Sequence, residues 1–115
     1  MESPGTDKSQ GVWPNGPADL ARLIETQPGS VVSRVLLKRK TGNVTLFAFA
    51  AGQELSEHTA PFDALLQILQ GQATISIAGN PFTVRAGEAI LLPAGKPHAV
   101  QAVSALHMLL TMIRE

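Results

Sequence analysis

The chain has 115 residues, nine basic and nine acidic side chains and no cysteine, a length that suits one domain with one hydrophobic core. Its zero net charge leaves no basic stripe for nucleic acid or for a membrane surface, and the lack of cysteine excludes disulfides and thiolate ligands. The start of the sequence has no signal-peptide pattern, and the longest apolar run, residues 105–113, is too short to cross a bilayer, so we expect a cytoplasmic protein.

The first part of the chain differs in composition from the rest. Residues 1–17 are polar and rich in glycine and proline, which predicts a flexible N-terminal arm. Trp13 is the exception, and its large apolar surface favours docking on the body of the protein. Residues 18–25 are predicted to form a short helix, because three apolar residues fall on one helical face (Leu20, Leu23 and Ile24).

From residue 30 onward the apolar pattern changes to the two-residue period of β-strands. Short segments rich in β-branched, aliphatic and aromatic residues alternate with glycine and proline turns, at residues 31–38, 44–50, 65–69, 73–78, 81–85, 89–93 and 105–113. Short strands at this regular spacing predict an all-β sandwich or barrel. We expect residues 18–115 to form this single domain.

Two spaced motifs lie within the strand-rich region. In the first, residues 52–71, five residues separate Gly52 from His58. In the second, residues 87–102, a Pro-x-Gly turn precedes His98. Together they resemble the two motifs of the cupin superfamily. The resemblance implies a small single-domain cupin, a double-stranded β-helix (jelly-roll) barrel with both histidines at its mouth.

The first motif departs from the family pattern at two metal-ligand positions. A typical cupin metal site combines three histidines and one glutamate, and Ala60 and Ala64 stand in two of these positions. Two neutral imidazoles alone hold a divalent ion poorly, so we expect no firmly bound metal. If a divalent transition metal (Fe, Mn, Ni, Cu or Zn) binds, the resemblance implies that His58 and His98 are its ligands.

Other polar side chains could join such a site only if strand phase or loop geometry allowed it (Gln67, Asp63 and His107). His107 matches neither motif, and we expect a hydrogen-bonded core or surface residue rather than a ligand. For Asp63 we favour a cap of the Pro61–Phe62 turn over a carboxylate–imidazole pair with His58. The phenylalanines are expected in the core or in the pocket wall (Phe47, Phe49, Phe62 and Phe82).

The resemblance implies a ligand pocket, which we expect to be lined by His58, His98, Ala60, Ala64, Phe62 and Gln67. The two alanines enlarge and dry this pocket where metal ligands would otherwise stand. The sequence therefore predicts a small-molecule-binding protein. The alternatives are a metal-dependent cupin enzyme of oxygenase or isomerase type with a reduced ligand set, a metal-free histidine acid–base catalyst, and a purely structural barrel. The absence of tyrosine disfavours the epimerase chemistry that pairs histidine with tyrosine.

Two predicted strands are apolar on both faces, at residues 31–38 and 105–113. A strand of a small isolated barrel needs only one buried face. The N-terminal segment could cover one patch, but a second copy related by two-fold symmetry would cover both strands. We therefore expect a homodimer with a mainly apolar interface.

Overall fold

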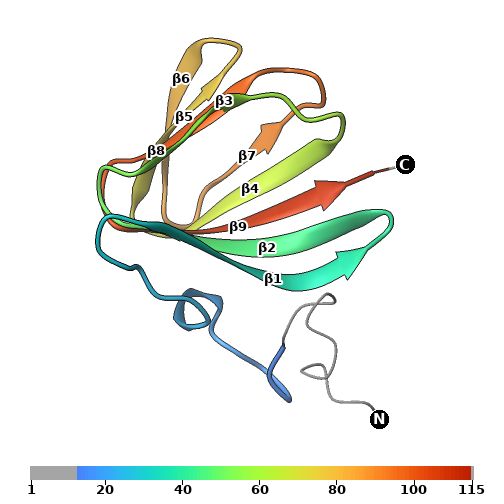
Figure 1. Ribbon diagram of the computed structural model, residues 1–115, viewed down its shortest axis with the longest axis vertical. Coiled ribbons are helices and arrows are strands. Elements are labelled where there is room, and N and C mark those ends of the chain that lie inside the picture. The colour runs from blue at the N-terminus through green and yellow to red at the C-terminus, as the bar shows by residue number, and fades with distance from the viewer. Residues whose placement is uncertain (1–12, 115) are drawn as a thin grey trace.

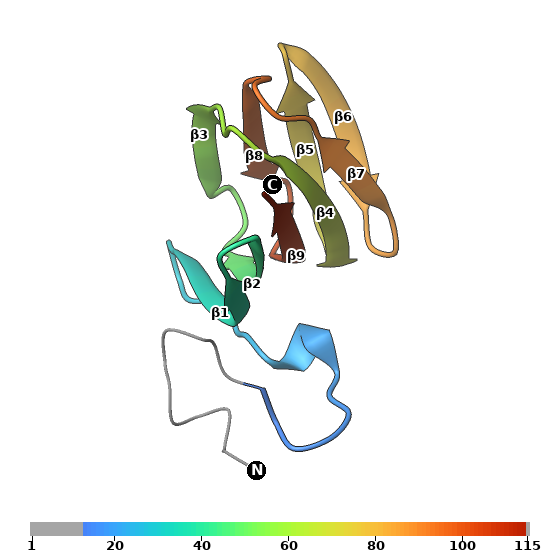
Figure 2. The ribbon, with the colours of Figure 1, turned by 90° about the vertical axis from the view of Figure 1, so that its right-hand side faces the viewer.

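The computed structural model describes residues 13–114, and within this range the chain forms nine strands in two antiparallel sheets (Figures 1 and 2). The strands are β1 (Val31–Arg39), β2 (Gly42–Phe49), β3 (Glu54–His58), β4 (Asp63–Gln70), β5 (Gln72–Ile77), β6 (Asn80–Arg85), β7 (Ala89–Leu92), β8 (His98–Ala102) and β9 (Leu106–Ile113). The five-stranded sheet has the order β1-β2-β9-β4-β7, and the four-stranded sheet has the order β3-β8-β5-β6. The predicted all-β jelly roll is confirmed.

The chain passes from one sheet to the other at several turns, and one of these turns requires glycine. Gly71 joins β4 of the first sheet to β5 of the second with a φ of 86°, in the left-handed region. A Cβ atom at this position would collide with the carbonyl oxygen of Ala105. The close approach of these two backbones brings the two sheets together at this end of the barrel.

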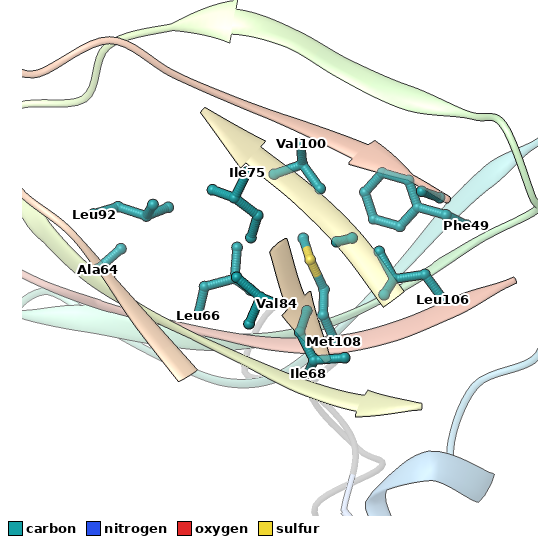
Figure 3. Packing of buried hydrophobic residues seen from close by; sticks show 12 residues of the cluster. Phe49, Ala64, Leu66, Ile68, Ile75, Val84, Leu92, Val100, Leu106 and Met108 are labelled. Atoms are coloured by element: carbon teal, nitrogen blue, oxygen red, sulfur yellow. The ribbon is translucent and has the colours of Figure 1, made fainter. Parts of the chain in front are cut away.

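The space between the sheets is occupied by apolar side chains from both of them (Figure 3). Alternate residues of each strand face inward, as the two-residue period requires. The buried set is Phe49, Ala64, Leu66, Ile68, Ala73, Ile75, Val84, Leu92, Val100, Ala102, Leu106 and Met108. The interior is therefore a packed core along most of its length.

Two aromatic predictions have opposite outcomes. Phe49 is fully buried in this core, and the ring of Phe47 packs against it with centroids 6.3 Å apart. Phe82, which we expected in the core or the pocket wall, is 47% exposed. The reason is its place on β6, an edge strand that pairs with β5 alone in its sheet.

The predicted helix at residues 18–25 is wrong. The structure has only a 3₁₀ turn there, η3 (Leu20–Arg22), and Oδ1 of Asp19 accepts a hydrogen bond from the Ala21 N–H at its start. A segment this short gains too few hydrogen bonds to offset the cost of nucleating an α-helix. The 3₁₀ turn still directs Leu20, Leu23 and Ile24 toward the sheet, so the predicted apolar face is present without the helix.

These apolar residues cover part of the outer face of the five-stranded sheet. They pack on a second buried cluster, formed by Leu36, Leu46, Ala48 and Leu109. Trp13 lines an apolar hollow of about 380 Å³ next to this cluster and is 38% exposed, so it contacts the body of the protein without being enclosed. Residues 1–12, most of the predicted arm, lie outside the described residues.

His107 also lies under this segment, on the outer face of β9. It is 7% exposed, and its Nδ1–H donates to the carbonyl oxygen of Ala21 at 2.8 Å. The prediction of a hydrogen-bonded structural histidine is confirmed. Across residues 13–114, no helix is long and apolar enough to span a membrane.

Candidate functional site

Two histidines meet at one end of the barrel. His58 ends β3, His98 begins β8, and the two residues are direct partners in the antiparallel pairing of these strands. Their Nε2 atoms are 3.1 Å apart, and their ring centroids are 4.3 Å apart with an edge-to-face tilt of 71°. The structure thus brings together two residues that are 40 positions apart in the sequence.

The Nδ1 atom of each ring is hydrogen-bonded to a backbone carbonyl. Nδ1 of His58 lies 2.9 Å from the carbonyl oxygen of Ser56, and Nδ1 of His98 lies 3.3 Å from that of Lys96. A carbonyl oxygen can only accept, so each Nδ1 carries the proton and each neutral ring presents its Nε2 lone pair. The two Nε2 atoms face each other at hydrogen-bond distance, so the pair can share one proton, and when both rings are neutral these atoms are two converging acceptors.

The two rings differ in their access to water. His58 is exposed, whereas His98 is 8% exposed. Burial lowers the pKa of His98, and the positive charge that His58 can carry lowers it further, while the carbonyl of Lys96 acts in the opposite direction. The inner ring therefore favours the neutral form, the form that keeps a lone pair on Nε2.

The loop at residues 93–97 is fastened to the segment that follows His58. The Gly95 N–H donates to the carbonyl oxygen of Ala60, and the Ala94 N–H donates to Oδ1 of Asp63, both at 2.8 Å. Asp63 therefore holds this loop rather than the Pro61–Phe62 turn that we expected it to cap. It also does not form the alternative pair with His58.

Three other predicted pocket residues differ in their burial and their contacts. Ala64 is buried in the core and pairs with Leu92 of β7, and Ala60 is half-buried. Phe62 is half-buried beneath the guanidinium of Arg114, which lies 5.2 Å from its ring centroid. These three residues lie in or next to the segment that joins β3 to β4.

Gln67 is not part of this group. It pairs with Leu109 of β9, whose side chain belongs to the outer cluster, whereas Ala64, Leu66 and Ile68 of the same strand face inward. Strand phase therefore places Gln67 on the outer face of the sheet, away from the interior that we expected it to line.

The donor set does not fit the four-ligand metal site of a typical cupin. Among residues 13–114, no group of three or more His, Cys, Asp or Glu side chains is placed to hold a metal ion. The candidates for recruitment are engaged elsewhere, because Asp63 accepts from Ala94 and His107 donates to Ala21. In the described part of the chain, His58 and His98 present two converging ligand atoms, and a protein metal site normally needs three or four.

The backbone carbonyls of Ser56 and Lys96 orient the two rings, and the sequence did not predict this role. Each lies two residues before its histidine. No side chain marks such a contact, so residue types could not have revealed it.

Comparison with known proteins agrees with this fold. The family model described as a cupin domain matches residues 45–113, more than half of the chain. The chain belongs to the cupin family. No curated protein matches it.

Solved structures give the same result. A protein of unknown function from Streptococcus pyogenes is 34% identical, with 91% of this chain and 92% of that one covered and a TM-score of 0.86. A cupin superfamily protein from Desulfitobacterium hafniense is 30% identical, with 91% and 96% covered and a TM-score of 0.86. A cupin 2 conserved barrel domain protein from Leptotrichia buccalis is 38% identical over 83% of this chain and 46% of that one, with a TM-score of 0.80.

Proposed function

We propose that this protein binds a small molecule at the barrel mouth and that His58 and His98 contact that molecule directly. The observation that carries the proposal is the convergence of their Nε2 atoms at 3.1 Å. With both Nδ1–H groups bonded to carbonyl oxygens, the Nε2 atoms of two neutral rings are hydrogen-bond acceptors that converge on one point. A bound molecule that supplies an N–H or O–H group satisfies them.

The residues in the missing-ligand positions of the first motif favour a molecule with an apolar part beside this donor. Ala60 and Ala64 offer methyl groups in the two positions where a typical cupin has ligands, and Leu92 pairs with Ala64. Small-molecule sites commonly combine such apolar walls with a few converging polar groups. The interior beyond is packed, so the proposed ligand lies at the mouth.

A thermal-shift screen against small metabolites tests this proposal. A compound that stabilises the native protein should lose affinity in His58→Ala and in His98→Ala, because each variant removes one acceptor. His107→Gln is the matched control, since that histidine serves the outer face. It should lower stability but leave the affinity unchanged. Equal binding by all three variants would show that the pair does not contact the ligand.

The second candidate is a metal-dependent cupin enzyme of oxygenase or isomerase type with a reduced ligand set. The same pair of Nε2 atoms supports it, because neutral imidazole is a common ligand of divalent Fe, Mn, Ni, Cu and Zn. Elemental analysis of freshly purified protein distinguishes the two candidates. About one metal per chain, lost in His58→Ala, would favour the enzyme, and substoichiometric metal would favour simple binding.

We also propose that the protein forms a homodimer through the outer face of the five-stranded sheet. One cross-strand row runs over all five strands of this sheet, through Leu37, Val44, Thr111, Leu65 and Leu91. Neighbours in such a row point to the same face. The exposed fractions of Leu37, Leu65 and Leu91 are 44%, 40% and 54%, so η3 leaves this part of the face open. We further propose that the protein is cytoplasmic, as the sequence suggests.

A further inference from the structure

Asp63 makes a long-range contact that the proposed binding chemistry does not itself use. It is the first residue of β4, and its carboxylate is exposed. Oδ1 accepts a hydrogen bond from the Ala94 N–H at 2.8 Å, across 31 residues of sequence. The carboxylate is therefore tied to the loop that leads into His98.

That loop, residues 93–97, has few internal degrees of freedom. Pro93 and Pro97 fix two of its φ angles, and the Lys96 N–H donates back to the carbonyl oxygen of Pro93 at 3.3 Å. Gly95 has a φ of 78°, a left-handed conformation that allows the tight turn. A short loop of this kind moves as a unit when one of its anchors is released.

The loop also contains the group that orients the inner ring. The carbonyl oxygen of Lys96 accepts from Nδ1 of His98, and the opposite nitrogen of that ring faces His58. A shift of the loop therefore turns the ring of His98 and changes the distance between the two Nε2 atoms. The chain of contacts runs from Asp63 through Ala94 and Lys96 to His98.

We infer that Asp63 is a positioning residue, which sets the distance between the Nε2 atoms of His58 and His98 by fastening the loop at residues 93–97. Its importance for binding rests on the proposed function, but its effect on the rings does not. Two backbone bonds also anchor this loop, from the Gly95 N–H to the carbonyl of Ala60 and from the Ala78 N–H to the carbonyl of Pro97, and no side-chain change removes either of them. Asp63 is thus the anchor that substitution can test.

Three variants distinguish the effect of losing the hydrogen bond from the effect of losing the carboxylate charge. Asp63→Ala removes both the carboxylate charge and the acceptor, whereas Asp63→Asn removes the charge but keeps an oxygen that can accept from Ala94. Glu88→Ala is the matched control, because Oε1 of Glu88 also accepts from a backbone N–H, that of Arg85, at 2.8 Å. That bond closes a different turn, between β6 and β7.

The measurement is long-range ¹H–¹⁵N NMR of the histidine rings at one fixed pH. Asp63→Ala should shift the ring resonances of His58 and His98 and leave those of His107 in place. Asp63→Asn should stay close to the native spectrum, and so should Glu88→Ala. The difference between the alanine and asparagine variants then isolates the hydrogen bond from the charge.

Three results would overturn the inference. One is a spectrum of Asp63→Ala that matches the native rings, and another is an equal shift in the alanine and asparagine variants. A shift of all three histidines would equally contradict it, since it would indicate general loosening of the fold. The proposed function fails by a different result, namely unchanged ligand affinity in His58→Ala and His98→Ala, so the two failures are distinguishable.

Discussion

The Nδ1–H group of His107 donates to the carbonyl oxygen of Ala21 at 2.8 Å, across 86 residues of sequence. The guanidinium of Arg34 donates in a similar way to the carbonyl oxygen of Leu23, at 2.6 Å. These two bonds fasten the N-terminal segment at the point where its apolar side chains meet the outer face of the five-stranded sheet. A buried carbonyl that loses its donor is costly, so both bonds bear on stability.

We predict that His107→Ala lowers the free energy of unfolding by about 1–3 kcal/mol, because it leaves the Ala21 carbonyl without its donor and opens a small cavity. His107→Gln should lose less, since its amide can still donate. Urea denaturation of both variants measures the difference. Equal losses would mean that the hydrogen bond contributes nothing beyond packing.

The buried ring of His98 should make stability depend on pH. Its pKa in the folded protein is lowered below the ordinary value of 6.5, mainly by burial and then by His58. The unfolded chain therefore binds a proton more readily, and stability falls as the pH is lowered from about 6.5 toward the folded pKa. At higher pH both states are neutral and this contribution is constant.

A urea titration at a series of pH values tests this dependence. As the pH is lowered from 6.5 toward the lowered pKa of His98, the stability of His98→Asn should fall less than that of the native protein, because the variant has no imidazole to protonate at this position. His107→Gln controls for the loss of an imidazole elsewhere. An unchanged slope in His98→Asn would assign the acid sensitivity to other groups.

Restoring the missing ligands should create strong divalent metal binding. Ala60→His and Ala64→Glu would add two donors to His58 and His98, and four donors are a normal protein set. Ala64 is only 6% exposed within the apolar core, so the added carboxylate should also lower the stability of the metal-free protein. Calorimetry with Mn²⁺ and Fe²⁺ measures the gain. An affinity no better than that of the native chain would show that these two alanines do not occupy ligand positions.

Light scattering at micromolar concentration should give twice the chain mass of 12.1 kDa. Leu65→Lys and Leu91→Lys place charge in the open part of the outer face and should shift the protein toward the monomer. Val103→Lys is the matched control, because Val103 is 53% exposed and follows β8, which belongs to the other sheet. A single-chain mass at every concentration would rule out a dimer, which needs a contact of about 1,000 Å² or more.

Much of the fold could be predicted because the strand period and the turn residues agree. The predicted strand at residues 105–113 corresponds to β9 (Leu106–Ile113), and its inward and outward faces are those that the alternation indicates. The prediction of a helix at residues 18–25 was wrong because the apolar spacing indicates which residues contact the sheet. It does not determine the backbone conformation that places them there. The predicted burial of Phe82 was wrong because residue type alone does not show that a strand lies at the edge of a sheet.

The candidate site was less accessible to sequence reasoning. The two motifs identified His58 and His98, but the orientation of each ring depends on backbone carbonyls, which residue types do not reveal. Gln67 was misplaced because its phase relative to Ala64 was left open, and strand alternation from Ala64 assigns it to the outer face. The contact of Asp63 with Ala94 joins the start of β4 to the loop at residues 93–97, and no local pattern predicts such a pairing.

The packed interior has a kinetic consequence for the proposed ligand. Apolar side chains occupy the space between the sheets, so a molecule that meets His58 and His98 at the mouth needs no opening of the barrel to arrive or to leave. Its association would then be limited by diffusion and orientation rather than by a conformational step. Differences in affinity among related compounds would appear mainly as differences in residence time.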